Sequence, residues 1–175
     1  MTRLLVLVYL AAIVLANLSV AHWGPRAAVY NAFLLIALDL VTRDRLHDAF
    51  GTGRELWTKM AVLVASGSVL SYVAARLFLE GNPAASIEKI ALASFLAFAA
   101  GATLDALVYQ ASRRSQWLER SNRSNVAGAA ADSVVFQTVA FGWSFPLIFA
   151  QFCAKVAGGV VWSLLLEYRR GEVRP

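Results

Sequence analysis

The sequence predicts an all-α fold, a polytopic membrane bundle of six transmembrane helices with both termini in the cytoplasm. Of the 175 residues, 59% are apolar and only 15% are charged, and the mean hydropathy is +0.60. The charged residues gather in clusters between long uncharged stretches, as in integral membrane proteins. Because a spanning helix takes roughly 20 residues, six spans use most of the chain, and we expect one membrane domain over residues 1–175.

Six apolar runs of helix length follow one another with short connections. We expect helices at about 4–21, 27–43, 56–79, 86–111, 125–143 and 146–168. The first run resembles a signal peptide, with Arg3 before an apolar core. Because Asn17 interrupts that core and five more spans follow, we interpret the run as a retained first helix. The third run holds Ser66-Gly67-Ser68, which we interpret as a packing motif of small residues.

The second run is short for a span. Its uncharged part ends just before Asp39, and about a dozen residues cover roughly 18 Å of helix, against about 30 Å of hydrocarbon. We therefore expect Asp39, Arg43 and Asp44 to border a water-filled inlet on the cytoplasmic side.

The fourth, fifth and sixth runs carry polar residues on one helical face. The three rows are Ser94, Phe98, Gly101 and Asp105; Asn125, Gly128, Asp132 and Phe136; and Gln151, Lys155, Gly158 and Trp162. Ionisable groups at such depth normally face a bundle interior or a wet cavity and mark a solute or ion pathway. These rows predict a small carrier.

Basic residues predict the orientation of the bundle. One side receives Arg3, Arg43, Arg45, Arg54, Lys59, Arg113, Arg114, Arg120, Arg123, Arg169, Arg170 and Arg174, and the other has little beyond Arg26 and Arg76. Since basic loops stay in the cytoplasm, both termini should be cytoplasmic, which agrees with an even number of spans. The net charge of +5 then reflects topology and anionic lipids, and we expect no nucleic-acid partner.

Two of the buried charges are expected near the middle of the membrane. Counting from the helix centres places Asp132 and Lys155 close to the midplane. An ion pair between them would keep both side chains charged. Alternatively, either side chain could be neutral because burial shifts its pKa.

The fourth and fifth helices share a short pattern in which a glycine precedes an aspartate by one turn. Gly101 and Asp105 match Gly128 and Asp132 at the same spacing. Small residues let helix backbones approach closely, so we expect a close crossing at the two glycines that brings the two carboxylates toward a common space.

At these residues the sequence resembles a known family. The stretch from Ala93 to Tyr109 is similar to the signature of the queuosine-precursor transporters, also called the vitamin uptake transporter family. Supporting likenesses are Asn17, Asp39 with Arg43, Trp117, Asp132 and the stretch Phe152-Cys153-Ala154-Lys155. The stretch after Arg43 departs from the family pattern, because Asp44, Arg45 and His47 intervene before Gly51.

The resemblance implies uptake of 7-cyano-7-deazaguanine, and of its aminomethyl relative, across the bacterial inner membrane for making queuosine in tRNA. We expect substrate contacts from Asn17, Asp39, Arg43, Ser94, Phe98, Asp105, Asp132, Gln137 and Lys155, and helix packing at Gly101, Gly128 and Gly158. A carboxylate can accept two hydrogen bonds from the N1–H and 2-amino groups of such a base, while O6 needs a donor such as Lys155 or Asn17. Phe95, Phe98, Tyr109 and Phe136 are the candidate stacking rings.

Other functions stay open at this point. A substrate-binding subunit of an energy-coupling-factor importer is also small and helical, and it would need an ATPase partner that a self-sufficient carrier does not. A structural membrane protein explains the apolar mass but not the aligned charges, and each candidate contact could instead be a structural polar contact between helices. The sequence has no phosphate-binding loop and no catalytic motif, so we expect neither an enzyme nor a bound cofactor or metal. A homo-oligomer is compatible with the sequence.

Overall fold

The computed structural model of the chain describes residues 2–51, 53–78 and 87–168, and these form helices joined by short turns. The elements are α1 (Thr2–Trp23), α2 (Pro25–Asn31), the π-helical turn η1 (Ala32–Ile36), α3 (Ala37–Phe50), α4 (Gly53–Phe78), α5 (Ile87–Ala111), α6 (Trp117–Phe141) and α7 (Phe145–Tyr168). Because α2, η1 and α3 follow one another without a break, the described chain contains six long helical segments. The predicted all-α bundle of six helices is confirmed.

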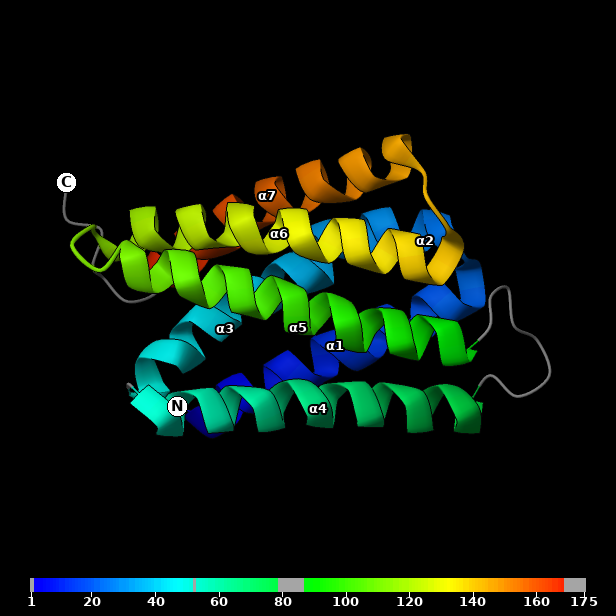
Figure 1. Ribbon diagram of the computed structural model, residues 1–175, viewed down its shortest axis with the longest axis horizontal. Coiled ribbons are helices and arrows are strands. Elements are labelled where there is room, and N and C mark those ends of the chain that lie inside the picture. The colour runs from blue at the N-terminus through cyan, green and yellow to red at the C-terminus, as the bar shows by residue number, and fades with distance from the viewer. Residues whose placement is uncertain (1, 52, 79–86, 169–175) are drawn as a thin grey trace.

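The helices run alternately up and down the bundle (Figure 1). The start of α1 and the end of α7 lie at the same end, on the left of that view. α5 and α6 pack side by side along their lengths, and α3 contacts α1, α4, α5, α6 and α7. α3 is therefore the central element around which the other helices gather.

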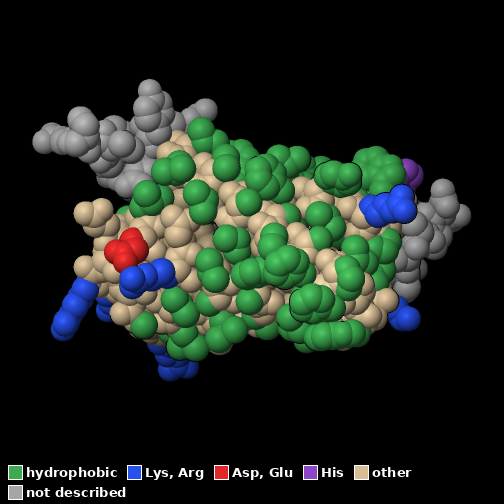
Figure 2. Space-filling view, turned by 90° about the horizontal axis from the view of Figure 1, so that it is seen from above, with side chains coloured by type: hydrophobic (Ala, Val, Ile, Leu, Met, Phe, Trp, Pro, Cys, Tyr) green, Lys and Arg blue, Asp and Glu red, His purple; other side chains and the backbone are tan. Residues whose placement is uncertain are grey.

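Five of the six helical segments are long and apolar enough to cross a membrane. They are Arg3–Trp23, Pro25–Phe50, Gly53–Ala74, Lys89–Ala111 and Phe145–Leu166. The remaining segment, α6, has 25 residues, but serines, amides and Asp132 on its buried face lower its hydropathy. In Figure 2 apolar side chains cover the middle of the visible face and charged ones lie toward its two ends, as expected for a surface in contact with lipid.

Two helices extend further than the sequence predicted. The second was expected to end at residue 43 but continues to Phe50, and the fifth was expected to begin at residue 125 but begins at Trp117. Both extensions are rich in polar residues, which hydropathy assigns to loops. In the structure some of these residues have protein partners, since Asp44 accepts a hydrogen bond from Ser121 and Asp48 pairs with Arg120. Residues 79 and 86, where the third and fourth helices were expected to end and begin, lie outside the described residues.

The expected water-filled inlet at the second helix is not open in this structure. Asp39, Arg43 and Asp44 are 0%, 2% and 1% exposed. They are enclosed because α3 has neighbours on all sides. The short uncharged stretch is thus explained by burial of charged groups in protein and not by access of water.

Glycines allow two of the tight turns between antiparallel helices. Gly24 has φ 76° and is followed by Pro25 at the first position of α2, where a missing N–H is harmless. Gly142 has φ 91° and caps α6, its N–H donating to the carbonyl of Thr138. A side chain at either φ would be strained.

The π-helical turn packs tightly against α7. Gly158 faces it so closely that an added Cβ would lie 2.7 Å from Ala37 Cβ and closer still to the carbonyl oxygen of Phe33. The indole N–H of Trp162 donates to the carbonyl of Leu34 at 3.0 Å. A widened turn is thus held in place by a glycine and a tryptophan one turn apart on α7.

Candidate functional site

A polar chamber lies inside the bundle between α1, the α2 and η1 region, α5, α6 and α7. The empty space among its lining side chains, together with space open to solvent at its edge, is about 340 Å³. It is lined by Ala16, Asn17, Val20, Ala28, Asn31, Ile36, Ser94, Phe98, Asp132, Phe136, Gln151 and Lys155. Every polar row predicted on the last three helices therefore contributes side chains to one space.

An ion pair lies at one wall of the chamber. Lys155 Nζ is 3.2 Å from Asp132 Oδ2 and donates to Ser133 Oγ at 3.0 Å. Lys155 is 2% exposed and Asp132 is 5% exposed. Charges buried to this extent must be compensated by a partner, and here each provides the partner of the other.

Amide and hydroxyl groups lie on the neighbouring walls. Ser94 Oγ donates to Asn17 Oδ1 at 2.5 Å, linking α5 to α1. Gln151 Nε2 donates to Gln137 Oε1 at 2.8 Å, linking α7 to α6. Asn17 Nδ2 is buried without a hydrogen-bond partner, so the chamber offers a donor that a bound solute could satisfy.

Two aromatic rings complete the lining. Phe98 and Phe136 are buried at the chamber, 3% and 9% exposed. Two other rings proposed from the sequence are elsewhere, because Phe95 is 42% exposed on the outer surface and Tyr109 lies near the end of the bundle. The structure thus brings to the chamber only Phe98 and Phe136 of the four proposed stacking rings.

The crossing of α5 and α6 is symmetric about two glycines. An added Cβ on Gly101 would lie 3.2 Å from Asp132 Cβ and 3.2 Å from the carbonyl oxygen of Gly128. An added Cβ on Gly128 would lie 3.1 Å from Asp105 Cβ and 3.2 Å from the carbonyl oxygen of Gly101. Each glycine therefore makes room for the aspartate of the other helix, as in a local two-fold arrangement.

The remaining predicted charges lie beside the chamber and do not line it. Arg43 Nη2 is 3.6 Å from Asp39 Oδ2, one turn apart on α3. Asp39 is also within electrostatic range of Asp132, Asp105 and Lys155. The buried charges of α3, α5, α6 and α7 therefore form one interacting group around the chamber.

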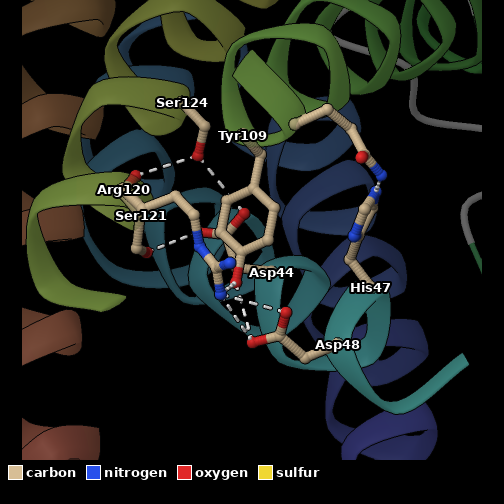
Figure 3. Close-up of polar contacts among 8 residues, drawn as sticks. Asp44, His47, Asp48, Tyr109, Arg120, Ser121 and Ser124 are labelled. Atoms are coloured by element: carbon tan, nitrogen blue, oxygen red, sulfur yellow. Dashed lines mark hydrogen bonds and ion pairs between the residues drawn. The ribbon is translucent and has the colours of Figure 1, made fainter. Parts of the chain in front are cut away.

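Asp44 is held between α3 and α6 by two serines. Ser121 Oγ donates to Asp44 Oδ2, and Ser124 Oγ donates to Asp44 Oδ1 at 3.3 Å (Figure 3). Asp105 of α5 is within electrostatic range of Asp44. Sequence reasoning placed Asp44 at an inlet and overlooked the two serines, although their spacing of three residues on α6 was a signal for a shared helical face.

A second polar network closes the end of the bundle where α3, α5 and α6 meet (Figure 3). Tyr109 Oη donates to Asp48 Oδ2 at 2.8 Å, and Arg120 Nη2 donates to Tyr109 Oη at 2.7 Å. Arg120 also contacts Asp48 Oδ1 at 3.1 Å. Next to it, Gln110 Nε2 and His47 Nε2 are 3.4 Å apart.

The sequence analysis missed part of the chamber lining. Asn31 was not considered, and Gln151 was placed in a polar row without being named as a candidate contact. Gln137, which was named, reaches the chamber only through its hydrogen bond with Gln151. The regular spacing of Gln151 and Lys155 on α7 was the signal that could have identified Gln151.

The family comparison establishes what class of protein has this architecture. Residues 32–169 match the model of the family described as "putative vitamin uptake transporter". The chain belongs to this family. The matched range includes every residue of α3, α5 and α6 described above, so the vitamin uptake transporter assignment covers most of the chamber. Comparison with curated proteins and with solved structures finds no match. As a vitamin uptake transporter with several apolar helices, the protein is a multi-pass membrane protein.

Proposed function

We propose that this transporter carries a flat, polar nucleobase inward across the bacterial inner membrane, namely 7-cyano-7-deazaguanine, with 7-aminomethyl-7-deazaguanine as a related cargo. The base would serve queuosine formation in tRNA. The observation that carries this proposal is the lining of the chamber, which combines a carboxylate, an ammonium group, amides and two phenyl rings in one buried space. A hydrocarbon-like or fully charged cargo would use only part of that lining.

The donors and acceptors of the chamber suit the edge of a deazaguanine. Asp132 can accept hydrogen bonds from the N1–H and the 2-amino group, and Lys155 can donate to O6. Asn17 Nδ2, buried without a partner, is a second donor. Phe98 and Phe136 can stack on the ring faces, a contact worth about 1–3 kcal/mol per base.

The structure corresponds to a closed state of such a carrier. The centre of a water molecule can occupy only about 20 Å³ of the chamber, which is room for about one water. A bicyclic base therefore requires the surrounding helices to separate. Alternating opening of two helix groups around a central site is the usual way in which secondary transporters load and release cargo.

Uptake in cells that cannot synthesise 7-cyano-7-deazaguanine tests the proposal. Cells expressing the transporter should accumulate the labelled base, and Asp132→Asn should lower accumulation at least about tenfold, because charge-assisted hydrogen bonds contribute about 1.5–3 kcal/mol. Glu119→Gln makes the same acid-to-amide change on the exposed face of α6 and should leave accumulation unchanged. No accumulation by wild type, or full accumulation by well-expressed Asp132→Asn, contradicts the proposal.

Purified protein in liposomes tests whether the carrier works alone. We expect it to exchange labelled for unlabelled base without any ATPase partner. Exchange that appears only when an ATPase module is added would instead identify a substrate-binding subunit of an energy-coupling-factor importer.

A further inference from the structure

A second hollow lies next to the chamber, between α1 and α2. This cleft is lined by Ser19, Trp23, Arg26, Ala27, Tyr30 and Asn31. The centre of a water molecule can occupy about 340 Å³ of the cleft, against about 20 Å³ of the chamber. Asn31 belongs to the lining of both hollows. The same side chain therefore borders the roomy cleft on one side and the tight chamber on the other.

Hydrogen bonds hold this side chain across the gap between the two helices. Asn31 Nδ2 donates to the carbonyl oxygen of Ala16 at 3.1 Å and to Ser19 Oγ at 2.5 Å. Ser19 Oγ in turn donates to the carbonyl oxygen of Ala16 at 2.9 Å. Ala16 lines the chamber and Ser19 lines the cleft. The bonds of Asn31 thus join α2 to α1 along the boundary between the two hollows.

α2 buries little apolar surface of its own. Of its seven residues, all within the described part of the chain, Ala28 alone is buried. Ala28 belongs to an apolar cluster with Val20 and Ala93. A methyl group contributes much less on burial than a leucine or phenylalanine side chain does. The hydrogen bonds of Asn31 are therefore a large part of what keeps α2 on α1.

The regular backbone is interrupted at both ends of α2. Gly24, with φ 76°, and Pro25 begin it, and the π-helical turn η1 begins at Ala32, directly after Asn31. Chains change direction at such glycines, and helices bend at π-helical turns. α2 is thus a short helix with a bending point on each side and a hydrogen-bonded side chain at its last residue.

The cleft lies at the end of the bundle where cargo from outside would arrive. α2 lies away from the start of α1 and the end of α7 (Figure 1). On the orientation predicted from the basic residues, that end is the outer one. Cargo that moves inward then meets the cleft before the chamber.

The exposed side chains of the cleft suit a flat polar cargo. Trp23 and Tyr30 are 69% and 73% exposed, and their rings offer stacking faces. Arg26 and Ser19 add hydrogen-bond donors. Aromatic side chains also anchor helices at membrane interfaces, so the rings alone do not identify a route. The position of Asn31 between the two hollows does.

We propose that the cargo enters the chamber through the cleft between α1 and α2, and that the hydrogen bonds of Asn31 to α1 are the gate that closes this route. The proposal rests on the transport function proposed above and adds the entry path. In the closed state described here, Asn31 holds α2 on α1. In the open state these bonds are broken, α2 turns at Gly24 and at the π-helical turn, and the base passes from the cleft into the chamber.

Thiol accessibility tests the gate without any cargo. In a Cys153→Ser background, Val20→Cys places a thiol in the lining of the chamber, at a position that is 2% exposed. A membrane-impermeant cationic thiosulfonate added outside intact cells should react slowly with this thiol. Asn31→Ala should raise the rate about tenfold, because tenfold corresponds to about 1.4 kcal/mol, which two lost hydrogen bonds can supply.

Asn122→Ala is the matched control. Asn122 Nδ2 donates to the carbonyl oxygen of Leu118 at 2.9 Å within α6, so the same amide is lost away from the cleft and the rate should not change. Ser19→Ala removes one of the two acceptors of Asn31 and should raise the rate about threefold, which provides a second variant if Asn31→Ala does not fold. Rates in Asn31→Ala and Ser19→Ala equal to that of their parent, or an equal rise in Asn122→Ala, overturn the proposal.

Transport in liposomes tests whether the cargo uses this route. In the same background, Ser19→Cys introduces a thiol of nearly the same shape into the cleft. A bulky thiosulfonate adduct on it should stop exchange of labelled for unlabelled 7-cyano-7-deazaguanine, and a reductant that removes the adduct should restore exchange. The Cys153→Ser parent, treated in the same way, should keep exchanging.

The results separate this route from the proposed cargo. Undiminished exchange through the fully modified Ser19→Cys variant refutes the route and leaves the cargo standing. Wild type that exchanges no base refutes the cargo, and the thiol reaction rates then decide alone whether Asn31 closes the cleft.

Discussion

Replacing Gly158 with alanine should disrupt the contact between α7 and the π-helical turn. The new Cβ would lie 2.7 Å from Ala37 Cβ and closer still to the carbonyl oxygen of Phe33. Neither neighbour is the end of a flexible side chain, so the helices themselves must separate. Overpacking costs about 1–3 kcal/mol and occasionally more, and contact with backbone places this substitution at the upper end, about 3 kcal/mol.

The adjacent glycine provides a matched control. A Cβ on Gly159 would lie 3.7 Å or more from its nearest neighbours, all atoms of Asn125, which is ordinary contact. Alanine is also the better helix former by about 0.8–1 kcal/mol, so Gly159→Ala should be neutral or slightly stabilising. Because this gain in helix propensity applies to both variants, they should differ by the overpacking cost of about 3 kcal/mol although they exchange the same groups one residue apart.

Thermal unfolding in detergent, followed by tryptophan fluorescence, measures this difference. For a chain of this size 1 kcal/mol corresponds to about 2–4 °C, so the midpoint of Gly158→Ala should lie about 10 °C below that of Gly159→Ala. Midpoints within about 2 °C of each other would show that α7 does not pack on the wide turn as described. A large loss in Gly159→Ala with none in Gly158→Ala would reverse the assigned rotation of α7.

Two further substitutions test contacts of the chamber wall and of the wide turn. Lys155→Met leaves the buried carboxylate of Asp132 without its cation and should lower the free energy of unfolding by about 3–5 kcal/mol. The double variant Lys155→Met with Asp132→Asn should be closer to wild type in stability. A double variant as unstable as the single one would exclude the ion pair. Trp162→Phe removes the hydrogen bond to the Leu34 carbonyl and should lower the free energy of unfolding by about 1 kcal/mol, measured by the same unfolding experiment, and no change would mean that the carbonyl has an equivalent partner.

The helical rows on α5, α6 and α7 could be predicted because helix periodicity is local. Ser94, Phe98 and Asp105 are all buried as their spacing indicates, and every long helix was located to within a few residues except at polar ends. Gly101 and Gly128 also indicated a close crossing of their helices. Each glycine precedes an aspartate by one turn, and this pattern can be recognised in the sequence alone.

The positions of charged groups in α3 could not be predicted from hydropathy. Arg45 is 5% exposed because Trp117, which is distant in the sequence, covers it. Asp44 is buried because serines of α6 donate to it. A hydropathy window covers only neighbouring residues and contains none of these partners. Hydropathy therefore assigns the charged segment to the cytoplasmic boundary of the membrane.

For the same reason, the sequence could not show which of two neighbouring phenylalanine rings faces the chamber. Phe95 and Phe98 are about one turn apart on α5. An inward helical face assigned from the sequence is wide enough to include both of them. The structure places only Phe98 at the chamber, because the rotation of α5 is fixed by Gly101 against α6. The rotation of a helix about its axis depends on its contacts with other helices. Hydrophobic periodicity indicates this rotation too coarsely to choose between the two rings.

The wide turn at Ala32–Ile36 divides the second membrane-crossing segment into two parts. The part before it presents Asn31 to the chamber, and the part after it carries Asp39 and Asp44. Helices bend at π-helical turns, where the regular ladder of backbone bonds is interrupted. The part before the turn therefore need not follow the same axis as the part after it, which is bound to α6 through the serine contacts of Asp44.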